Sequence, residues 1–285
     1  APDADRDAVA DAEVPDAAPP PAFVAVAAGT MHGCAADNRQ RAVCWGNPAD
    51  DRTAAPPGPI VGVSAGTLHS CGLGADAHVV CWGTYPADST PPPPDGHFLR
   101  IRSGDDHTCG LRDDRTLACW GLPGNDGRTV PPPGAFTDLA LGSDHACAIA
   151  ADTGAVRCWG DAGDGRLAAP PDACFAVAAG DKHSCALRTA DHHPVCWGKN
   201  SQGQSDPPDE PFEAIDAGHD FVCGLRANGS VRCWGRNDSR LDVPAGSFSV
   251  LGVGFDHACA IRADGAVRCW GNNGSDRATP PDPAP

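Results

Sequence analysis

Near its end the sequence reads Gly254-Phe255-Asp256-His257-Ala258-Cys259, and ten residues after Cys259 it reads Cys269-Trp270-Gly271. This pair of motifs occurs seven times in 285 residues, and the other leading glycines are Gly29, Gly66, Gly104, Gly142, Gly180 and Gly218. Each Cys-Trp-Gly motif contains one of the seven tryptophans, and successive tryptophans are 36 to 39 residues apart. A constant period of this length predicts a stacked or circular array of one supersecondary unit.

Each repeat is expected to form three or four short β-strands. The first strand precedes the glycine and carries apolar residues six and three positions before it, as at Phe248 and Leu251. The second strand runs through the His-x-Cys-x-Leu segment, in which alternate residues share one face. The third strand leads into Cys-Trp-Gly, and a loop that often ends in Pro-Pro leads on to the next unit. The sequence therefore predicts an all-β array that folds as one body.

Fourteen of the 15 cysteines form seven pairs, one in each repeat. Cys259 and Cys269 are symmetric about Asp264, so they face each other if residues 263–265 form a hairpin loop with Gly265 in the left-handed conformation. Opposed positions on antiparallel strands are close enough for a disulfide, which contributes about 3 kcal/mol. The predicted pairs are Cys34–Cys44, Cys71–Cys81, Cys109–Cys119, Cys147–Cys158, Cys185–Cys196, Cys223–Cys233 and Cys259–Cys269.

A metal site is the alternative to disulfides, since His32, Cys34 and Cys44 could offer three ligands. Repeat six keeps both cysteines but carries Phe221 in place of the histidine, so the pair does not need an imidazole. We therefore expect no metal and no other cofactor, and we assign the histidines to bonds with backbone groups near the glycine turn. They are His32, His69, His107, His145, His183 and His257. The free thiol, Cys174, is expected to be a small buried apolar side chain, with a disulfide between two chains as the alternative.

Seven disulfides predict an oxidising compartment, so we expect a secreted, periplasmic or cell-surface protein. The sequence starts at Ala1 without an initiator Met, and it has no apolar run long enough to cross a membrane. We interpret the chain as the mature part of an exported protein. Residues 1–21 are rich in Ala, Asp and Pro, and we expect them to form a disordered acidic tail or spacer. One domain is expected at residues 22–285.

The formal net charge of −16 bears on the kind of partner. It argues against a nucleic acid, because binding to phosphates requires clustered Lys and Arg. It also disfavours docking on an anionic membrane. Much of this charge serves solubility. We therefore expect a monomer whose partner is another protein.

The segment Gly-x-x-His-x-Cys-Ala-Leu, followed by a turn and Val-x-Cys-Trp-Gly, resembles the regulator of chromosome condensation repeat family in its bacterial, cysteine-bearing form. Over residues 23–285 the resemblance implies a single seven-bladed β-propeller with four-stranded blades. In a closed ring, we expect residues 23–28 to pair beside the last repeat and complete that blade. Only residues 200–204 carry the Asn-x-x-Gly-Gln loop that is common in the family. The exported members that inhibit class A β-lactamases are the most similar, and they bind through loops on one face.

Three classes of function remain open. The ring can be a protein-binding module, for example an inhibitor of a β-lactamase or penicillin-binding protein. It can be a structural or adhesive component of the cell surface, or an enzyme or small-ligand binder at its central channel. The sequence has no nucleophile elbow, no phosphate-binding glycine loop and no zinc-protease helix. A catalytic site should also break the symmetry of the repeats, whereas the histidines recur at a scaffold position. We therefore favour a binding module that is not an enzyme.

The two residues between the glycine and the histidine vary from repeat to repeat, and they form the candidate interaction rim. Equivalent turns share one end of a ring, where they would place a small apolar sector beside an acidic arc. In this hypothesis Met31, Leu68 and Phe255 anchor a protein partner, and the aspartates steer a basic one. The alternative is a set of ordinary solvated turn aspartates. The acidic members are Asp105, Asp106, Asp144, Asp181, Asp220 and Asp256.

Overall fold

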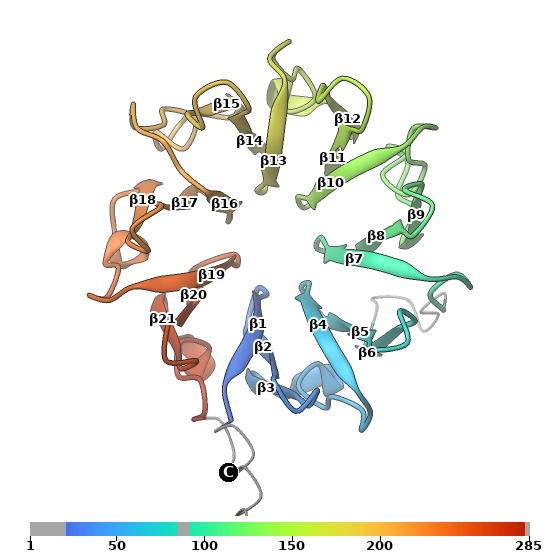
Figure 1. Cartoon of the computed structure of the whole chain (residues 1–285), viewed down its shortest axis with the longest axis vertical. Coiled ribbons are helices and arrows are strands. Elements are labelled where there is room, and N and C mark those ends of the chain that lie inside the picture. The colour runs from blue at the N-terminus through green and yellow to red at the C-terminus, as the bar shows by residue number, and fades with distance from the viewer. Residues whose placement is uncertain (1–20, 85–91, 283–285) are drawn as a thin grey trace, which may run out of the picture.

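The computed structural model describes residues 21–84 and 92–282 as an all-β ring of seven blades around a central opening (Figure 1). Each blade is one three-stranded antiparallel sheet. Its first strand runs inward to the opening, where a tight turn leads into the second strand (Figure 1). The predicted seven-bladed propeller is therefore confirmed, with three strands in each described sheet rather than the four that the resemblance implied. The tail predicted at residues 1–21 lies outside the described residues, apart from Pro21.

The strands follow one another around the ring in the order of the chain. Blade 1 comprises β1 (Phe23–Ala28), β2 (His32–Asp37) and β3 (Ala42–Gly46); blade 2 comprises β4 (Ile60–Ala65), β5 (His69–Gly74) and β6 (Val79–Gly83); blade 3 comprises β7 (Phe98–Ser103), β8 (His107–Arg112) and β9 (Leu117–Gly121). Blade 4 comprises β10 (Phe136–Leu141), β11 (His145–Ala150) and β12 (Val156–Gly160); blade 5 comprises β13 (Cys174–Ala179), β14 (His183–Arg188) and β15 (Pro194–Gly198). Blade 6 comprises β16 (Ala214–Ala217), β17 (Phe221–Leu225) and β18 (Val231–Gly235); blade 7 comprises β19 (Phe248–Val253), β20 (His257–Arg262) and β21 (Val267–Gly271).

Short 3₁₀ turns occur in four of the loops that follow Cys-Trp-Gly in the described residues. They are η1 (Ala49–Asp51), η2 (Gly163–Gly165), η3 (Ser239–Leu241) and η4 (Gly274–Asp276). None of the helices in this part of the chain is long or apolar enough to cross a membrane.

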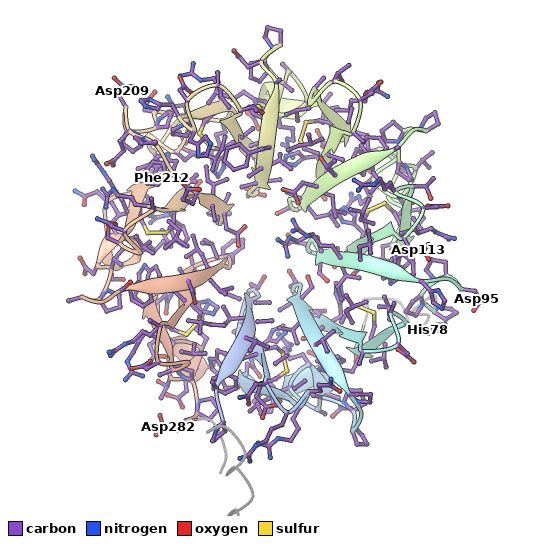
Figure 2. The ribbon with its side chains drawn as sticks, in the orientation of Figure 1. His78, Asp95, Asp113, Asp209, Phe212 and Asp282 are labelled. Carbon is purple, nitrogen blue, oxygen red and sulfur yellow. A yellow bond between two sulfur atoms is a disulfide. The ribbon has the colours of Figure 1, made fainter. Side chains whose placement is uncertain are left out.

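The seven predicted disulfides are confirmed. Each pair occupies opposed positions on the second and third strands of one blade, with Cα atoms 4.0 Å apart. Figure 2 shows the sulfur–sulfur bonds distributed around the ring. The left-handed residue predicted at Gly265 has a φ of 81°, and a residue with positive φ ends the equivalent loop in every other blade. Those residues are Gln40, Ala77, Arg115, Gly154, His192 and Gly229.

The apolar core lies within and between neighbouring blades. A buried residue stands at or just before the beginning of each first strand; in blade 6 it is Phe212, whose ring centroid lies 5.7 Å from that of Trp234. One apolar cluster joins Phe23 and Trp45 of blade 1 to Ile261 and Val267 of blade 7. A single repeat therefore cannot bury its apolar face alone, as expected for a repeat architecture.

The ring is closed by the same contacts that join the other blades. The backbone N–H of Phe23 donates to the carbonyl oxygen of Gly265 at 2.9 Å, as that of Ile60 donates to Gln40 at 2.7 Å between blades 1 and 2. The indole Nε1–H of Trp45 also donates to the carbonyl oxygen of Arg277 at 2.9 Å. Strand β1 pairs with β2, so the expectation that residues 23–28 complete the last blade is wrong. Closure relies on packing and hydrogen bonds between blades, not on a shared sheet.

Cys174 is the free cysteine, and its reactivity tests the disulfide assignment. Its side chain is 3% exposed, and burial raises the pKa of the thiol to about 11. We therefore expect the folded protein to resist alkylation at mildly alkaline pH, because the thiolate is the reactive form. Unreduced, denatured protein should take up one label per chain, counted by mass spectrometry. Several labels per chain, or a disulfide-linked dimer, would contradict the assignment.

Candidate protein-binding face

The seven leading glycines meet around the central opening. A β-carbon at Gly29 would lie 2.5 Å from the carbonyl oxygen of Gly66 in the next blade, and the same contact recurs around the ring. It closes between the last and first blades, where a β-carbon at Gly254 would lie 2.3 Å from the carbonyl oxygen of Gly29. Glycine is required here by the close approach of two backbones, and this contact sets the spacing of the blades.

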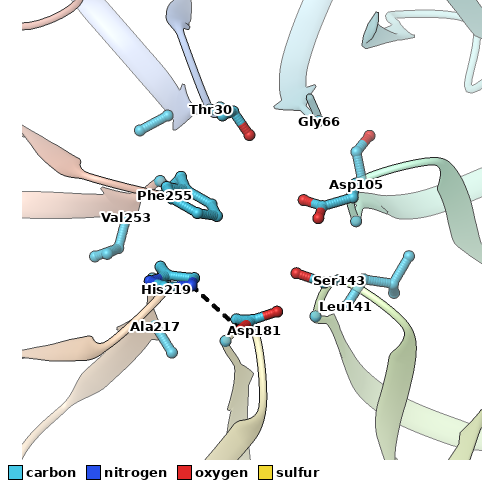
Figure 3. A pocket seen from close by; sticks show the side chains of 18 of the residues that line it. Thr30, Gly66, Asp105, Leu141, Ser143, Asp181, Ala217, His219, Val253 and Phe255 are labelled. Carbon is cyan, nitrogen blue, oxygen red and sulfur yellow. Dashed lines mark ion pairs between the residues drawn. The ribbon is translucent and has the colours of Figure 1, made fainter. Parts of the chain in front are cut away.

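The first variable residue of each turn belongs to the inner ring, and all of its members except Thr67 line the mouth of the channel (Figure 3). The inner ring consists of Thr30, Thr67, Asp105, Ser143, Asp181, His219 and Phe255. Side-chain contacts link its members from blade to blade. The Thr67 hydroxyl lies 2.9 Å from that of Thr30 and donates to Asp105 at 3.0 Å. Further around the ring, Asp181 forms an ion pair with His219 at 3.3 Å, and His219 stacks on Phe255 with ring centroids 4.1 Å apart.

The second variable residue of each turn belongs to the outer ring, which consists of Met31, Leu68, Asp106, Asp144, Lys182, Asp220 and Asp256. The backbone carbonyls of these residues accept hydrogen bonds from the residue that follows each Cys-Trp-Gly motif. For example, Asn47 donates to Met31 at 2.9 Å, and Leu122 donates to Asp106 at 2.8 Å. The inner ring, the outer ring and the loops after Cys-Trp-Gly therefore share one end of the propeller, which we call the turn face.

The predicted interaction rim is divided by the structure into residues with and without ion-pair partners. Asp144 pairs with Arg128 at 2.6 Å, and Asp256 pairs with Arg240. Asp220 is 3% exposed and lies within 3.4 Å of Lys199 and 2.9 Å of His219. These three carboxylates hold the loops of the turn face in place. Asp106, by contrast, has no ion pair within 4.0 Å in the described residues.

The inner ring places two carboxylates beside one imidazole. Burial raises the pKa of Asp105, although hydrogen bonds with Ser143 and Thr67 oppose the shift. For Asp181, burial acts in the same direction, but hydrogen bonds with His219 and Ser143 outweigh it and lower the pKa. The hydrogen bond to Asp181 raises the pKa of His219. The imidazole of His219 contacts the carboxylates of Asp181 and Asp220 and the ring of Phe255.

The sequence analysis missed a set of arginines that link neighbouring blades. The Trp82 indole N–H donates to the carbonyl oxygen of Arg52 at 2.9 Å, and the Arg52 guanidinium donates to the carbonyl oxygen of Thr67 at 3.1 Å. The other linking arginines are Arg128, Arg166, Arg240 and Arg277. Gln204 takes this place in blade 5 and accepts from Trp234 at 3.2 Å. The signal was an arginine six to eight residues after most tryptophans, at the place of the glutamine in the family motif.

Three of the six scaffold histidines, His32, His69 and His145, bond differently from the prediction, and the ring nitrogens of the other three have no hydrogen-bond partner in the described residues. Nε2 of His32 lies 2.7 Å from the hydroxyl of Ser70, and Nε2 of His145 lies 2.8 Å from that of Ser184. These partners are side chains of the next blade rather than the expected backbone groups. The equivalent neighbour of His107 is Ala146, and Nε2 of His107 has no hydrogen-bond partner in the described residues. Burial lowers the pKa of five of the histidines to about 3 and that of His183 to about 4.

The metal alternative finds no support in the described residues, where no three His, Cys, Asp or Glu side chains are grouped as metal ligands. The cysteines that could have supplied thiolates are joined in disulfides. A thiolate ligand requires a free, deprotonated cysteine. The repeated His-x-Cys element is therefore part of the scaffold.

The repeats match the family model of the regulator of chromosome condensation (RCC1) repeat at residues 100–128, 136–166, 176–204, 212–240 and 251–276. These five matches cover about half of the chain. The chain therefore belongs to the RCC1 repeat family. No curated protein is significantly similar to it in sequence.

Solved structures of other propellers resemble the whole ring. The ectodomain of the Arabidopsis thaliana receptor kinase ACR4 is 24% identical, with 90% of this chain and 97% of that chain covered and a TM-score of 0.74. The ectodomain of the Physcomitrella patens receptor kinase CR4 is 25% identical, with 88% and 74% covered and a TM-score of 0.76. Prp20p from Saccharomyces cerevisiae, studied for its binding to Gsp1p and histones, is 16% identical, with 91% and 74% covered and a TM-score of 0.59. The similarities to ACR4 and Prp20p support the fold alone.

Two substitutions compare Asp220, which forms ion pairs with the loop, with Asp106, which forms none in the described residues. Asp220→Asn removes the charge shared by Lys199 and His219, and we expect the free energy of unfolding to fall by about 1–3 kcal/mol. Asp106→Asn changes a half-buried carboxylate without an ion pair, and we expect a change within about 0.5 kcal/mol. Urea unfolding with the disulfides intact measures both values. Equal effects of the two substitutions would show that the ion pairs around Asp220 do not hold the loop.

The scaffold histidines predict that stability falls as the pH is lowered below neutrality. Their pKa values are depressed in the folded state, so below about pH 6.5 the unfolded chain binds protons that the folded chain does not. Each histidine then costs about 1.4 kcal/mol per pH unit. Urea unfolding between neutral pH and mildly acidic pH measures the slope. His107→Phe, which copies Phe221 of blade 6, should make the slope shallower by one proton; an unchanged slope would contradict this assignment.

Proposed function

We propose that this protein is an exported module that binds another protein through the turn face. As a member of the RCC1 repeat family it is a disulfide-bonded propeller, and its seven disulfides suit an oxidising compartment. The related propeller of CR4 is the ectodomain of a receptor kinase, which also supports a place outside the cytoplasm. We expect the protein to act there as a monomer.

The observation that carries this proposal is the division of each repeat into constant and variable positions. The recurring glycine, histidine, cysteine and tryptophan are used in the ring itself, in blade spacing, blade-to-blade hydrogen bonds and disulfides. The two variable positions of every turn lie together on one face. A rigid frame that presents variable side chains on one surface is the arrangement expected of a binding scaffold.

The turn face is asymmetric in a way that suits a protein partner. Met31 and Leu68 lie on adjacent blades, and Phe255 lies on the blade before them. Apolar anchors of this kind dominate the affinity of protein interfaces, and charges around them govern the association rate. The aspartates without ion pairs, rather than the whole acidic arc, would supply this steering; Asp106 is the example on the outer ring. The mouth of the channel, by contrast, holds a cavity of only about 60 Å³, far below the size of a typical small-molecule site.

Site-specific photo-crosslinking tests the proposal with matched leucines. A photoreactive phenylalanine analogue would replace Leu68 on the turn face in one variant. In the other it would replace Leu99, which is 56% exposed near the beginning of β7 and far from the turn. Each variant is mixed with an extract of extracellular and envelope proteins from the source organism. We expect a discrete protein adduct from the Leu68 variant that is absent from the Leu99 variant.

The outcome depends on which protein is crosslinked and on whether unlabelled protein competes for it. Mass spectrometry identifies the crosslinked protein, and an excess of unlabelled protein should abolish the adduct. An adduct that forms equally from both positions would show that the turn face is not the binding surface. Two further variants carry the photoreactive residue at Met31 and Phe255, and the absence of an adduct from these and from the Leu68 variant would reject the proposal.

A further inference from the structure

The first strands contain a second departure from sevenfold symmetry, which the sequence analysis did not detect. Two and four places after the buried residue that opens each repeat, which is Phe212 in blade 6, stand residues of which several line the channel or the cavity beside it. In most blades they are small: Ala25, Gly62, Ala176, Ala214 and Val250 at the first place, and Ala27, Ser64, Ala140, Ala178 and Gly252 at the second. The exceptions are Arg100 and Arg102 on β7, Asp138 on β10 and Asp216 on β16.

Arg100 and Arg102 of β7 and Asp138 of β10 line a cavity of about 300 Å³ that is separate from the turn face. The cavity lies between strands β7, β10, β13 and β16 and adjoins the channel at Arg102, which lines both. Its volume is at the lower end of the range typical of sites for small organic molecules. Four different blades thus supply its walls.

The charged groups of this cavity are paired, with one exception. Arg100 pairs with Asp138, whose second carboxylate oxygen accepts the backbone N–H of Val177 at 3.2 Å. Glu213 lies 3.4 Å from Nδ1 of His192. Arg102 makes no ion pair within 4.0 Å with any described residue. The cavity therefore presents one guanidinium with free donors.

Asp216 lines the neighbouring channel but does not neutralise this guanidinium directly. Its two carboxylate oxygens accept backbone N–H groups, from Val253 at 2.8 Å and from Ala217 at 2.9 Å. Burial raises the pKa of Asp216, and the charge of Arg102 acts in the opposite direction from a distance. Asp216 thus joins blades 6 and 7, and the donors of Arg102 remain available.

Part of the cavity wall is apolar. It includes Phe175, which is half-buried, and Val177 and Ile215, which are buried; Thr137 also lines the cavity. Phe175 is held by His192, with ring centroids 4.6 Å apart. A guanidinium binds a carboxylate through two parallel hydrogen bonds, and the adjoining apolar surface can accept a hydrocarbon group.

We propose that this cavity binds a small organic carboxylate. The carboxylate lies on the guanidinium of Arg102, and the aliphatic or aromatic part of the ligand packs against Phe175 and Ile215. This site is independent of the protein-binding proposal, because it lies between the first strands and shares no residue with the inner or outer ring.

Calorimetric titration of the whole protein with hexanoate and phenylacetate tests the site. Hexanamide, which lacks the charge, and inorganic phosphate, which lacks the hydrocarbon, are the comparison ligands. We expect saturable binding of both carboxylates and much weaker binding of the comparison ligands. Arg102→Ala should weaken hexanoate binding about 10- to 100-fold, as expected for the loss of a charged hydrogen-bonding partner. Alanine is the residue that blades 1, 4 and 5 carry at this place, so the variant is expected to fold.

Two further variants complete the comparison. Arg39→Ala removes an exposed arginine from the hairpin of blade 1 and should leave binding unchanged. Arg102→Lys keeps the charge but loses the two-pronged geometry, and should bind with intermediate affinity. Unchanged hexanoate affinity in Arg102→Ala would overturn the proposal, as would failure of both carboxylates to bind. Equal affinity for phosphate and hexanoate would show that the apolar wall plays no part, and would overturn it as well.

Discussion

The close approach of seven glycines to seven carbonyl groups is the contact on which the remaining geometry depends. Each glycine lies so near the carbonyl oxygen of the next blade that a β-carbon would not fit, and the last contact returns to Gly29. Because this spacing holds the inner ends of the blades together, it aligns His32, His69 and His145 with the hydroxyl of the next blade. It also brings six tryptophan indoles to a loop carbonyl of the preceding blade, whereas the indole N–H of Trp120 has no hydrogen-bond partner in the described residues. Any larger residue at these positions would widen the ring and separate all of these partners.

The covalent links of this ring lie within blades, and its non-covalent links also join one blade to the next. Disulfides connect the second and third strands within a blade, whereas hydrogen bonds, aromatic contacts and arginine side chains connect neighbouring blades. The apolar residues alone are mostly small, so the hairpins depend on their disulfides for rigidity. Beside these symmetric links, the repeats differ most in the side chains at two places: the turn face, and the cavity beside Arg102.

The parts of the structure that depend on residues within one repeat could be predicted from the sequence. The number of blades, the disulfide register and the left-handed residue at Gly265 all follow from spacing along the chain. Contacts between blades could not be read in this way. The partners of His32, the pairing of β1, the loop arginines such as Arg277 and the ion pairs of Asp220 depend on which side chains of separate repeats meet. Arg102 was overlooked because it is unusual only by comparison with the small residues that other blades carry at the same place.

The closing junction is chemically the same as the junctions within the chain. The hydrogen bond from Phe23 to Gly265 has its counterpart between blades 1 and 2, and Trp45 meets Arg277 as Trp82 meets Arg52. The junction between blades 7 and 1, which no loop crosses, therefore uses the same kinds of contact as the six junctions where a loop connects consecutive blades. A circularly permuted gene that joined the described ends and opened any other loop would specify the same set of contacts.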